Sequence, residues 1–547
     1  MSARTASLIA DVFRASPLRH GQFRLFYAGS IAAALGYTMQ ATVAAWLMAT
    51  LTPSALMVAL VQTASTAPSL LFGLLSGALA DIVDRRRVVL ITQVVLFAAT
   101  VSLGIATLIG LIGPLTLLAL TFLIGTAFTF YLPAQQASVN DLVSRQDLPR
   151  AVALGAVAFN LARAVGPALA GAIAAWIGTG SASIASACFF VVTIMAVKGW
   201  KKNTPVLPGV PETLFSGVRS GLRYARHSPL MRALIVRNLS FSACASALWA
   251  LLPVIARDQL SLGAGGFGLL SAGFGVGAIA GALTIPRHLQ RVSLNTVVSS
   301  AILLWVGATL LIAFTAITMV ALVGMFGAGA AWVGVLASLS AGTQSAAPAW
   351  VRARAVAMNL VAMQASLALG SAVWGSLASL FGIGVALAAS AGVMSLLLIL
   401  NRRVRVRLGN DADVTPGAQL PDLGLAVPPL PDDGPVLIQV EYRIAPENLP
   451  AFLRAIHAVE RTRRRNGADD WRVFRDIAEQ DCFVERYIIS SWAEYVRQRS
   501  RMTVSDRQSQ ERVAKLQQPD VEIRVSRLIG IDPREVVATV SKSSDAD

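Results

Sequence analysis

Long apolar runs without any charged residue constrain this chain more than any other feature of its sequence. From Leu25 to Leu400 they follow one another with only short charged segments between them, and a helix of about 20 apolar residues crosses the hydrocarbon core of a bilayer. Only 14% of the 547 residues are charged, compared with about 25% in a soluble globular domain. The sequence therefore predicts an all-α polytopic membrane protein up to residue 401, followed by a soluble segment.

Twelve transmembrane helices are predicted, in two sets of six. The first set covers 25–49, 55–80, 88–110, 115–141, 151–176 and 182–198, and the second covers 232–256, 266–286, 293–314, 318–343, 355–380 and 384–400. Alternate connections are rich in arginine and lysine, whereas the opposite connections carry little besides Arg257. Because basic loops stay in the cytoplasm, we expect both termini, including the segment 1–24, to be cytoplasmic.

Charge and cysteine content argue against several other classes of protein. The formal net charge of +16 comes largely from loops between apolar runs, where membrane topology accounts for it, so no nucleic-acid partner is expected. Three cysteines without a close pair and four histidines predict neither a disulfide framework nor a metal site. We expect no cofactor, and the sequence contains no G-x-x-x-x-G-K-[ST] loop that would bind ATP.

The two sets of six helices are related by an internal repeat. "RAVALGAVAFNLARAVGPALAGAIAAWIG" starts at Arg150, and "RAVAMNLVAMQASLALGSAVWGSLASLFG" starts 204 residues later, with twelve of 29 positions identical. At the same offset, "GALADIVDRRRVVL" at Gly77 is matched by "GALTIPRHLQRVSL" at Gly281. The alternative, a shared content of small residues, does not explain one offset for two separate segments. Parallel six-helix repeats predict a substrate site between the halves near the membrane midplane, with access alternating by rocking.

The stretch "GALADIVDRRRVVL" resembles the loop signature between the second and third helices of the major facilitator superfamily, although Asp84 replaces its second glycine. The resemblance implies the twelve-helix fold of that superfamily and a latch that closes the cytoplasmic side. The alternative is that the arginines only set the topology. The residues assigned to this gate are Gly77, Asp81, Arg85, Arg86, Arg87, Arg352 and Arg354.

The stretch "NLARAVGPALAG" resembles the fifth-helix signature of major facilitator exporters through Gly166, Pro167 and Gly171. The resemblance implies export, and close helix packing is the alternative. "GLRYARHSPLMRALIVRN" and "YLPAQQASVNDLV" resemble the transmembrane secretion effector group, which includes the enterobactin exporter branch. That resemblance implies a bacterial inner-membrane exporter of siderophores or other small molecules.

Polar residues inside predicted membrane helices are costly, so they are candidates for substrate or ion binding. Arg163 lies about midway along the fifth helix, one turn after Asn160. Together they would suit an anionic substrate. The alternative is that Arg163 is a structural residue bound by carbonyl groups or by Gln135 or Gln136. The weaker substrate candidates are Gln40, Asn359 and Gln364. Asp81 and Asp141 are the candidates for coupling to protons.

After a short linker at 402–434, the segment 435–530 has the element order β-α-β-β-α-β, typical of a ferredoxin-like domain, with the second helix expected to break near Thr503. The remaining boundaries are a linker with an amphipathic helix at 200–231 and a final tail at 531–547. The stretch "RRRNGADDWRVFRDIAEQDCFVERYIISSWAEYVRQRSRMTVSDR" resembles the tail of many members of the same exporter group, in which histidines stand at the places of Tyr495 and Arg499. Such tails resemble the domains of antibiotic-biosynthesis monooxygenases. The other notable side chains of this soluble segment, Trp471, Trp492, Glu485 and Glu494, form no recognisable set of catalytic roles, so an interaction or homodimer module is expected rather than an enzyme.

These observations together predict a secondary transporter that exports a small organic molecule by proton antiport and alternating access. Two alternatives remain open. One is an uptake permease with the same fold, and the other is a membrane-tethered sensor or enzyme that acts through the soluble domain.

Overall fold

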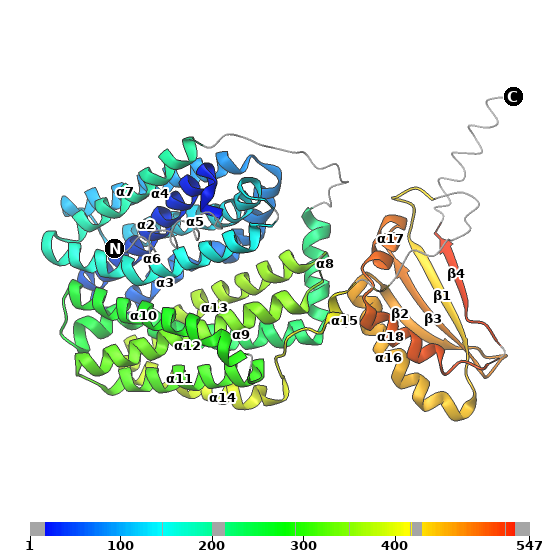
Figure 1. Cartoon of the computed structure of the whole chain (residues 1–547). Helices are drawn as coiled ribbons and strands as arrows, with labels where there is room; N and C mark the ends of the chain where they lie inside the picture. The colour runs from blue at the N-terminus through cyan, green and yellow to red at the C-terminus, as the bar shows by residue number, and fades with distance from the viewer. Residues whose placement is uncertain are drawn as a thin grey trace, which may run out of the picture. The chain divides into compact units, whose positions relative to one another are not determined.

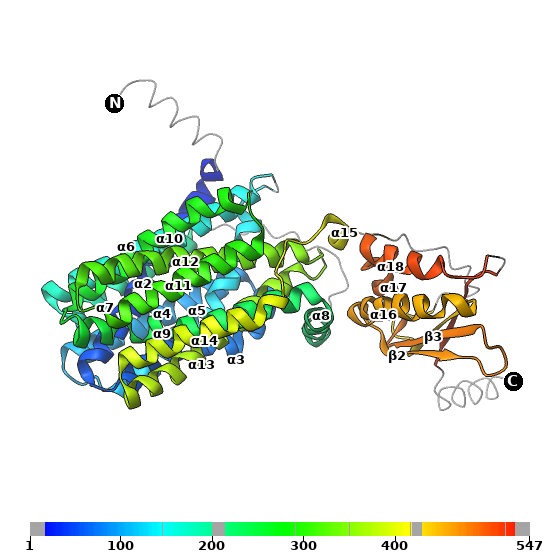
Figure 2. The same ribbon diagram turned by 90° about the horizontal axis from the view of Figure 1, so that it is seen from below.

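A computed structural model describes residues 17–530, apart from 145, 200–213, 290, 349, 416, 418–428 and 520. Within this part it contains twelve helices long and apolar enough to cross a membrane. Those of the first half are α2 (Gly21–Leu51), α3 (Ala55–Ile82), α4 (Arg85–Leu108), α5 (Pro114–Leu142), α6 (Leu148–Ile177) and α7 (Thr179–Lys198). Those of the second half are α9 (Pro229–Val254), α10 (Ala264–Leu289), α11 (Leu294–Phe314), α12 (Thr318–Ala346), α13 (Arg352–Phe381) and α14 (Ile383–Leu400). Figure 1 shows the two halves as a blue-to-cyan and a green-to-yellow group, and Figure 2 shows them from below.

The prediction of twelve membrane helices is confirmed, with each end within a few residues of its expected place. Local chemistry explains several of these ends. The Ser54 and Ser293 hydroxyls and the Asp84 carboxylate each accept a bond from a backbone N–H in the first turn of α3, α11 and α4, which satisfies a donor that a helix leaves free. Prolines in the first turns of α5 and α6 have no N–H to satisfy.

The repeat is visible in the backbone as well as in the sequence. Gly178 joins α6 to α7 with φ 89° and ψ 162°, and Gly382 joins α13 to α14 with φ 89° and ψ 161°. These glycines stand 204 residues apart, at the offset of the sequence repeat. A positive φ strains any residue that carries a Cβ. The same glycine-dependent turn therefore closes the last helix pair in both halves.

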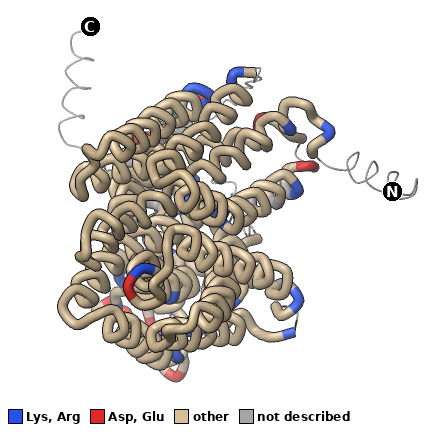
Figure 3. Tube along the Cα trace, turned by 90° about the vertical axis from the view of Figure 1, so that its left-hand side faces the viewer, with Lys and Arg blue, Asp and Glu red and all other residues tan. Residues whose placement is uncertain are grey.

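The outer surfaces of these helices are apolar. Leu111, Leu115, Trp176, Phe314 and Leu380 are each more than 70% exposed, as expected for side chains that face lipid tails. Seen from the left-hand side of the Figure 1 view, the traces are almost entirely tan, with few charged positions (Figure 3). The molecule is therefore built for a membrane, in which every backbone polar group must be satisfied within the helices.

Residue contacts divide the chain into two compact units. The first comprises Met1–Pro211, Ile235–Ser340 and Asn359–Val406, and the second comprises Glu212–Leu234, Ala341–Met358 and Arg407–Asp547. The second unit thus combines the soluble domain with the first turns of α9 and α13, the end of α12, and α8 (Leu214–His227). The helix α8 is the amphipathic helix expected between the two halves. It has four basic residues, Arg219, Arg223, Arg226 and His227, and no acidic one.

The soluble part contains an antiparallel sheet of β1 (Val436–Arg443), β2 (Asp469–Arg475), β3 (Cys482–Ile489) and β4 (Arg524–Ile529), in the spatial order β2-β3-β1-β4. One face is covered by α16 (Leu449–Asn466), α17 (Trp492–Ser500) and α18 (Val504–Ala514), as Figures 1 and 2 both show. Alternate residues of β1 are buried, as expected for a strand with one face on a core. The predicted order of strands and helices is therefore present.

The expected break in the last helical segment lies between α17 and α18. Thr503 accepts a bond from the backbone N–H of Asp506, and the Asp506 carboxylate accepts one from the backbone N–H of Thr503. This reciprocal pair satisfies two donors and starts a new helix. Met502 and Thr503 are also buried, so the break belongs to the domain core.

Candidate functional site

The two halves meet along two seams of small residues, and the first seam joins α6 to α10. A Cβ added to Gly171 would lie 2.8 Å from the Cα of Gly268, and one added to Gly268 would lie 2.7 Å from the carbonyl oxygen of Pro167. Gly275 similarly lies against Ala164, so close that a Cβ would overlap its backbone. Backbones approach this closely only where side chains are absent or small. Gly171 and Pro167 of the predicted export motif therefore form the contact with the other half.

The second seam joins α3 to α13. The Thr63 hydroxyl donates to the carbonyl oxygen of Ala368 at 2.9 Å, and the backbone N–H of Leu56 donates to the Ser379 hydroxyl at 2.9 Å. Between these bonds Gly375 lies directly against Ala59. Gly375 stands 204 residues after Gly171, so equivalent glycines of the repeat serve the two seams. The interface between the halves is thus symmetric in its chemistry, with few polar bonds to break.

The remaining member of the export motif packs within the first half. A Cβ on Gly166 would overlap the Thr38 hydroxyl of α2, and this hydroxyl donates to the carbonyl oxygen of Ala162 at 3.0 Å. The motif therefore places α6 between α2 and α10, as the close-packing interpretation expects. Its link to the direction of transport stays a prediction.

Arg163 lies next to the first seam, one residue before Ala164. Its side chain is half-buried, and its guanidinium carbon lies 5.1 Å from the centre of the Phe159 ring. Among the described residues no acidic side chain pairs with it. Gln135, an alternative partner in the sequence, instead donates to the Ser30 hydroxyl at 3.0 Å. Arg163 therefore places a positive charge near the contact between the halves. The Phe159 ring forms a cation–π contact with this charge.

The other substrate candidates lie at different places in the two halves, and the hydrogen bonds of Gln40 and Asn359 do not join them into one cluster. Gln40 is buried and accepts a bond from the Ser186 hydroxyl of α7 at 3.2 Å, so it faces the interior of the first half. The side-chain oxygen of Asn359 and its carbonyl oxygen both accept from Asn238, each at 2.9 Å. Asn160 and Gln364 are half-buried on α6 and α13. Gln40 and Asn359 thus serve as helix-to-helix bonds in this state.

Asn238 is a polar residue that the sequence reasoning missed as a site candidate. It is 1% exposed, donates twice to Asn359 and accepts from the Ser242 hydroxyl at 3.1 Å. Such a bonded amide costs little in a membrane helix. Its position within an apolar helix, in a stretch already singled out for its family resemblance, was the signal that could have identified it.

The arginines of the gate motif fasten helix ends inside the first half. Arg85 pairs with both oxygens of Asp141, at 2.9 and 3.0 Å, and Arg86 donates to the carbonyl oxygen of Lys198 at 2.8 Å, at the end of α7. A cation at a helix C-terminus is favourable. Asp84, which replaces a glycine of the signature, starts α4 as its N-cap. Asp141 is therefore part of a partly exposed ion pair, 31% exposed.

The other gate residues differ in their exposure and in their contacts. Arg87 is exposed, and a Cβ on Gly77 would meet nothing within 4 Å. Arg352 donates to the carbonyl oxygen of Ala347 at 3.1 Å, and Arg354 is half-buried. The side chain of Asp81 lies outside what the structure describes. The predicted latch between Asp81 and the second half stays a prediction.

Arg257, the basic exception among the opposite loops, also links the halves. It lies in the π-helical continuation of α9, η2 (Ile255–Gln259), a type of bulge that is frequent at functional sites. Its guanidinium donates to the carbonyl oxygens of Ala49 and Thr52 at the end of α2, the second at 3.0 Å, and also binds Asp258. One guanidinium thus joins the C-terminal end of the first helix to the second half.

The second unit contains a charge cluster centred on Glu494. Its carboxylate accepts from Arg501 at 2.7 Å, from Arg497 at 3.0 Å and from Arg223 of α8 at 3.1 Å. The Arg501 guanidinium also lies 4.5 Å from the centre of the Trp350 ring, in the loop between α12 and α13. Within the second unit, the soluble domain is therefore bonded to α8 and to Trp350.

A second buried carboxylate, Glu485, lies in the domain core. It is fully buried and accepts from Trp471 at 2.9 Å, from Arg463 at 3.1 Å and from the Tyr442 hydroxyl at 3.1 Å. Nearby, burial raises the pKa of Tyr487 to about 12, although the Arg463 charge opposes this. Trp471 and Glu485, two residues noted in the sequence, are thus hydrogen-bonded to each other. Arg463 and Tyr442 also donate to the Glu485 carboxylate. Tyr495 accepts from Arg527 at 2.7 Å on the same side of the sheet.

A family model described as transmembrane secretion effector matches residues 13–535. The staphyloferrin A transporter of Staphylococcus aureus is 24% identical over 253 residues, which cover 46% of this chain and 63% of that protein. The multidrug efflux pump Tap of Mycolicibacterium fortuitum is 24% identical over 229 residues, covering 40% and 56%. The chain therefore spans less than two thirds of the length of these relatives.

Solved transporter structures share the fold. A variant of the nucleoside transporter NupG superposes with a TM-score of 0.57 at 14% identity, covering 70% of this chain and 99% of that one. A bacterial homologue of the human lysosomal transporter Spinster, inward-facing and unoccupied, superposes with a TM-score of 0.55 at 13% identity, covering 71% and 96%. At such identities the likeness concerns the fold alone.

Proposed function

Because the chain belongs to the transmembrane secretion effector family, we propose that it exports a small organic molecule across the bacterial inner membrane by alternating access. That the protein is a membrane transporter of the major facilitator type follows from the family, the relatives and the fold. The observation that supports alternating access is the pair of glycine seams. Two repeat halves that touch through small residues have few interlocking side chains to displace when they rock.

The charge beside the first seam supports an anionic substrate. Arg163 is half-buried, and no acidic side chain among the described residues pairs with it. A carboxylate or catecholate would supply the missing negative charge. A relative that carries the name staphyloferrin A transporter makes a siderophore the first compound class to test, and the efflux-pump relative makes a drug the second.

The energy source proposed is proton antiport, with both termini in the cytoplasm. Within the twelve-helix region acids occur only at helix ends or in loops, so any proton carrier lies close to a membrane face. Asp81 and Asp141 are the proposed carriers. For Asp141 this requires the ion pair with Arg85 to open during the cycle.

We assign the soluble part to the ferredoxin-like class from its β-α-β-β-α-β chain order and its strand order. We propose that it acts as an interaction or homodimer module rather than as an enzyme. The carboxylate of Glu485 is already bound by three side chains, which suits a structural role.

The deciding experiment compares metabolites inside and outside cells that lack the protein with those in cells that overproduce it, with and without iron. Export predicts a compound that accumulates inside without the protein and outside with it. A compound that becomes scarce inside without the protein would identify an uptake permease instead. A protein truncated after residue 434 separates the remaining alternative, because a sensor or enzyme acting through the soluble domain would lose all activity.

A further inference from the structure

Arg237 is a buried charge whose bonding is incomplete. It lies on α9 and is 3% exposed. A single nitrogen, Nη2, makes all its polar contacts, to the side-chain oxygen of Asn295 at 3.4 Å and to the carbonyl oxygens of Asn401 and Val404 at 3.3 and 3.4 Å. Nε and Nη1 are buried and have no hydrogen-bond partner anywhere in the described chain. Two donors of a permanent cation are therefore left for a ligand.

The surroundings of Arg237 provide no negative charge to balance it. Its three acceptors are neutral, and none of the ion pairs among the described residues includes it. The carbonyl oxygens at the end of α14 supply only the partial charge of a helix C-terminus. The turn that follows α14 adds further positive charge, because Arg402 and Arg405 are exposed there. An arginine stays charged in proteins, so this place favours an anion.

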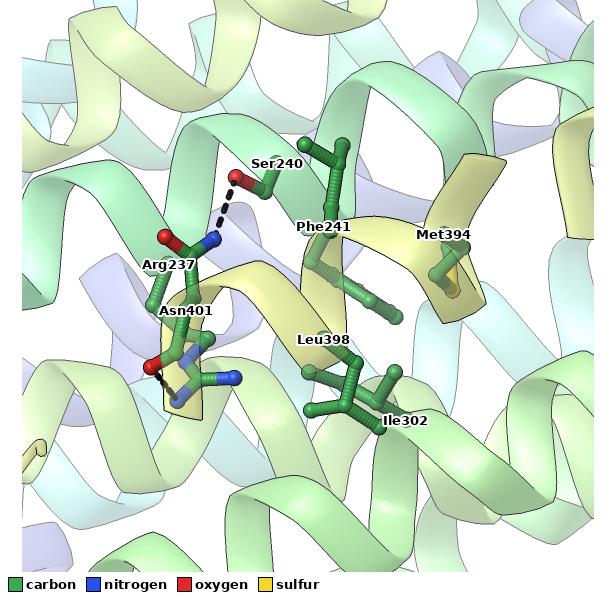
Figure 4. A pocket seen from close by; sticks show the side chains of 8 residues that line it. Arg237, Ser240, Phe241, Ile302, Met394, Leu398 and Asn401 are labelled. Carbon is green, nitrogen blue, oxygen red and sulfur yellow. Dashed lines mark hydrogen bonds between the residues drawn. The ribbon is translucent and has the colours of Figure 1, made fainter. Parts of the chain in front are cut away.

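A small cavity opens next to Arg237, between α9, α11 and α14. Its volume is about 10 Å³, which is room for one oxygen atom the size of a water molecule. One end is polar, with Arg237, Ser240 and Asn401, and Figure 4 shows Asn401 bonded to both of the others. The rest is apolar and is formed by Phe241, Ile302, Met394, Leu397 and Leu398. The cavity is therefore polar at the end formed by Arg237 and apolar elsewhere.

The cavity also lies at the level where lipid headgroups are expected. Asn401 is the first residue after α14, a helix of 18 apolar residues that is just long enough to span the bilayer core. Leu396, Ile399 and Leu400 next to it are more than half exposed. A ligand that reaches Arg237 beside these side chains comes from the membrane rather than from water.

We propose that Arg237 binds the phosphate of an anionic phospholipid through its unpaired donors Nε and Nη1, with an acyl chain along the exposed Leu396, Ile399 and Leu400. The shared chemistry is that of an oxyanion, so a free phosphate is the competing source. Basic pockets between transmembrane helices are suited to such headgroups. This site is independent of the transported substrate and of the direction of transport.

The test measures the melting temperature of the purified full-length protein in detergent, with added phosphatidylglycerol or with phosphatidylcholine of the same acyl chains. We expect phosphatidylglycerol alone to raise the melting temperature of the wild type. Arg237→Gln should abolish the shift and weaken the apparent affinity at least tenfold. Arg232→Gln, which removes an exposed charge from the same helix, should keep it.

Two results would overturn the proposal. One is an Arg237→Gln protein that responds to phosphatidylglycerol like the wild type. The other is an equal shift with inorganic phosphate, which would assign the site to a soluble anion. If Arg237→Gln does not fold, Leu398→Trp tests the apolar side while leaving the charge in place. It should reduce the phosphatidylglycerol shift, and an unchanged shift would refute the lipid.

Discussion

At the scale of single residues, several charges of the membrane part hold helix ends together. Asp147 shows this best, because it was not among the candidates from the sequence. It is buried just before α6 and accepts from Arg19 at 2.7 Å and from the Ser144 hydroxyl at 3.1 Å. Burial favours a higher pKa for Asp147, but the Ser144 hydroxyl and the Arg19 charge outweigh it and lower the pKa.

This lowered pKa gives a pH-dependent prediction. A carboxylate whose pKa is lower in the folded state stabilises the fold above its unfolded pKa of about 4, and this stabilisation disappears as the pH falls through the folded value. Asp147→Asn should therefore lower the melting temperature at pH 7, and the gap to the wild type should begin to narrow below about pH 4 and close once the pH passes below the lowered folded pKa. Asp411→Asn, at an exposed position, is the control. A gap that persists unchanged at low pH would contradict the charge pair.

Arg163 supports a second prediction, which rests on the proposed function. A charge-assisted hydrogen bond is worth about 1.5–3 kcal/mol, so Arg163→Gln should weaken binding of an anionic substrate roughly 10- to 100-fold. Arg163→Lys should recover part of this loss. Uptake of labelled substrate into inverted vesicles measures the effect, with the exposed Arg287→Gln as control. Equal transport by Arg163→Gln and the wild type would assign Arg163 a structural role.

At the scale of elements, the seams are the feature with the clearest consequence for motion. Gly171 and Gly375 occupy equivalent places in the repeat and each touches the other half. A methyl group added at Gly171 would collide with backbone atoms of α10 rather than with a movable side chain.

We therefore expect Gly171→Ala and Gly375→Ala each to destabilise the protein by about 1–3 kcal/mol and to slow transport. Gly307→Ala is a matched control in α11, since a Cβ there meets nothing within 4 Å. It should be neutral or stabilise by roughly 0.5–1 kcal/mol, the usual effect of alanine in a helix interior. Thermal unfolding in detergent and vesicle transport provide the measurements. Equal behaviour of all three variants would show that the seams are not tightly packed.

The helices and strands themselves were largely predictable from the sequence, and the contacts between them were not. Apolar length identified the twelve membrane helices, and the local pattern of the soluble segment predicted its order of strands and helices, because these signals are local. The partners of Arg85 and Asn359 lie 56 and 121 residues away in the sequence, and no local pattern encodes such pairs. Gln40 is another example, since its bond with Ser186 of α7 joins residues 146 positions apart.

At the scale of the whole molecule, the second compact unit crosses the boundaries expected along the chain. It combines α8, the loop between α12 and α13, and the soluble domain. Glu494 is the centre of this arrangement, with a side chain that is 11% exposed and bound by three arginines.

Removing this charge should release α8. Breaking a buried ion pair by removing one partner costs about 3 kcal/mol or more, so Glu494→Gln should speed hydrogen exchange in α8 by roughly tenfold or more. Glu522→Gln, at an exposed position, should leave α8 protected as in the wild type. Exchange in α8 that is the same in both variants would show that α8 is held by other contacts.

The turns at Gly178 and Gly382 have a consequence for ancestry. The two halves now differ at most aligned positions of the repeat, yet these two residues keep backbone angles that agree to within one degree. Gene duplication has therefore preserved geometry here while side chains drifted. Distant members of this lineage should be easier to recognise by the spacing of such glycines with positive φ than by any side chain that contacts the substrate.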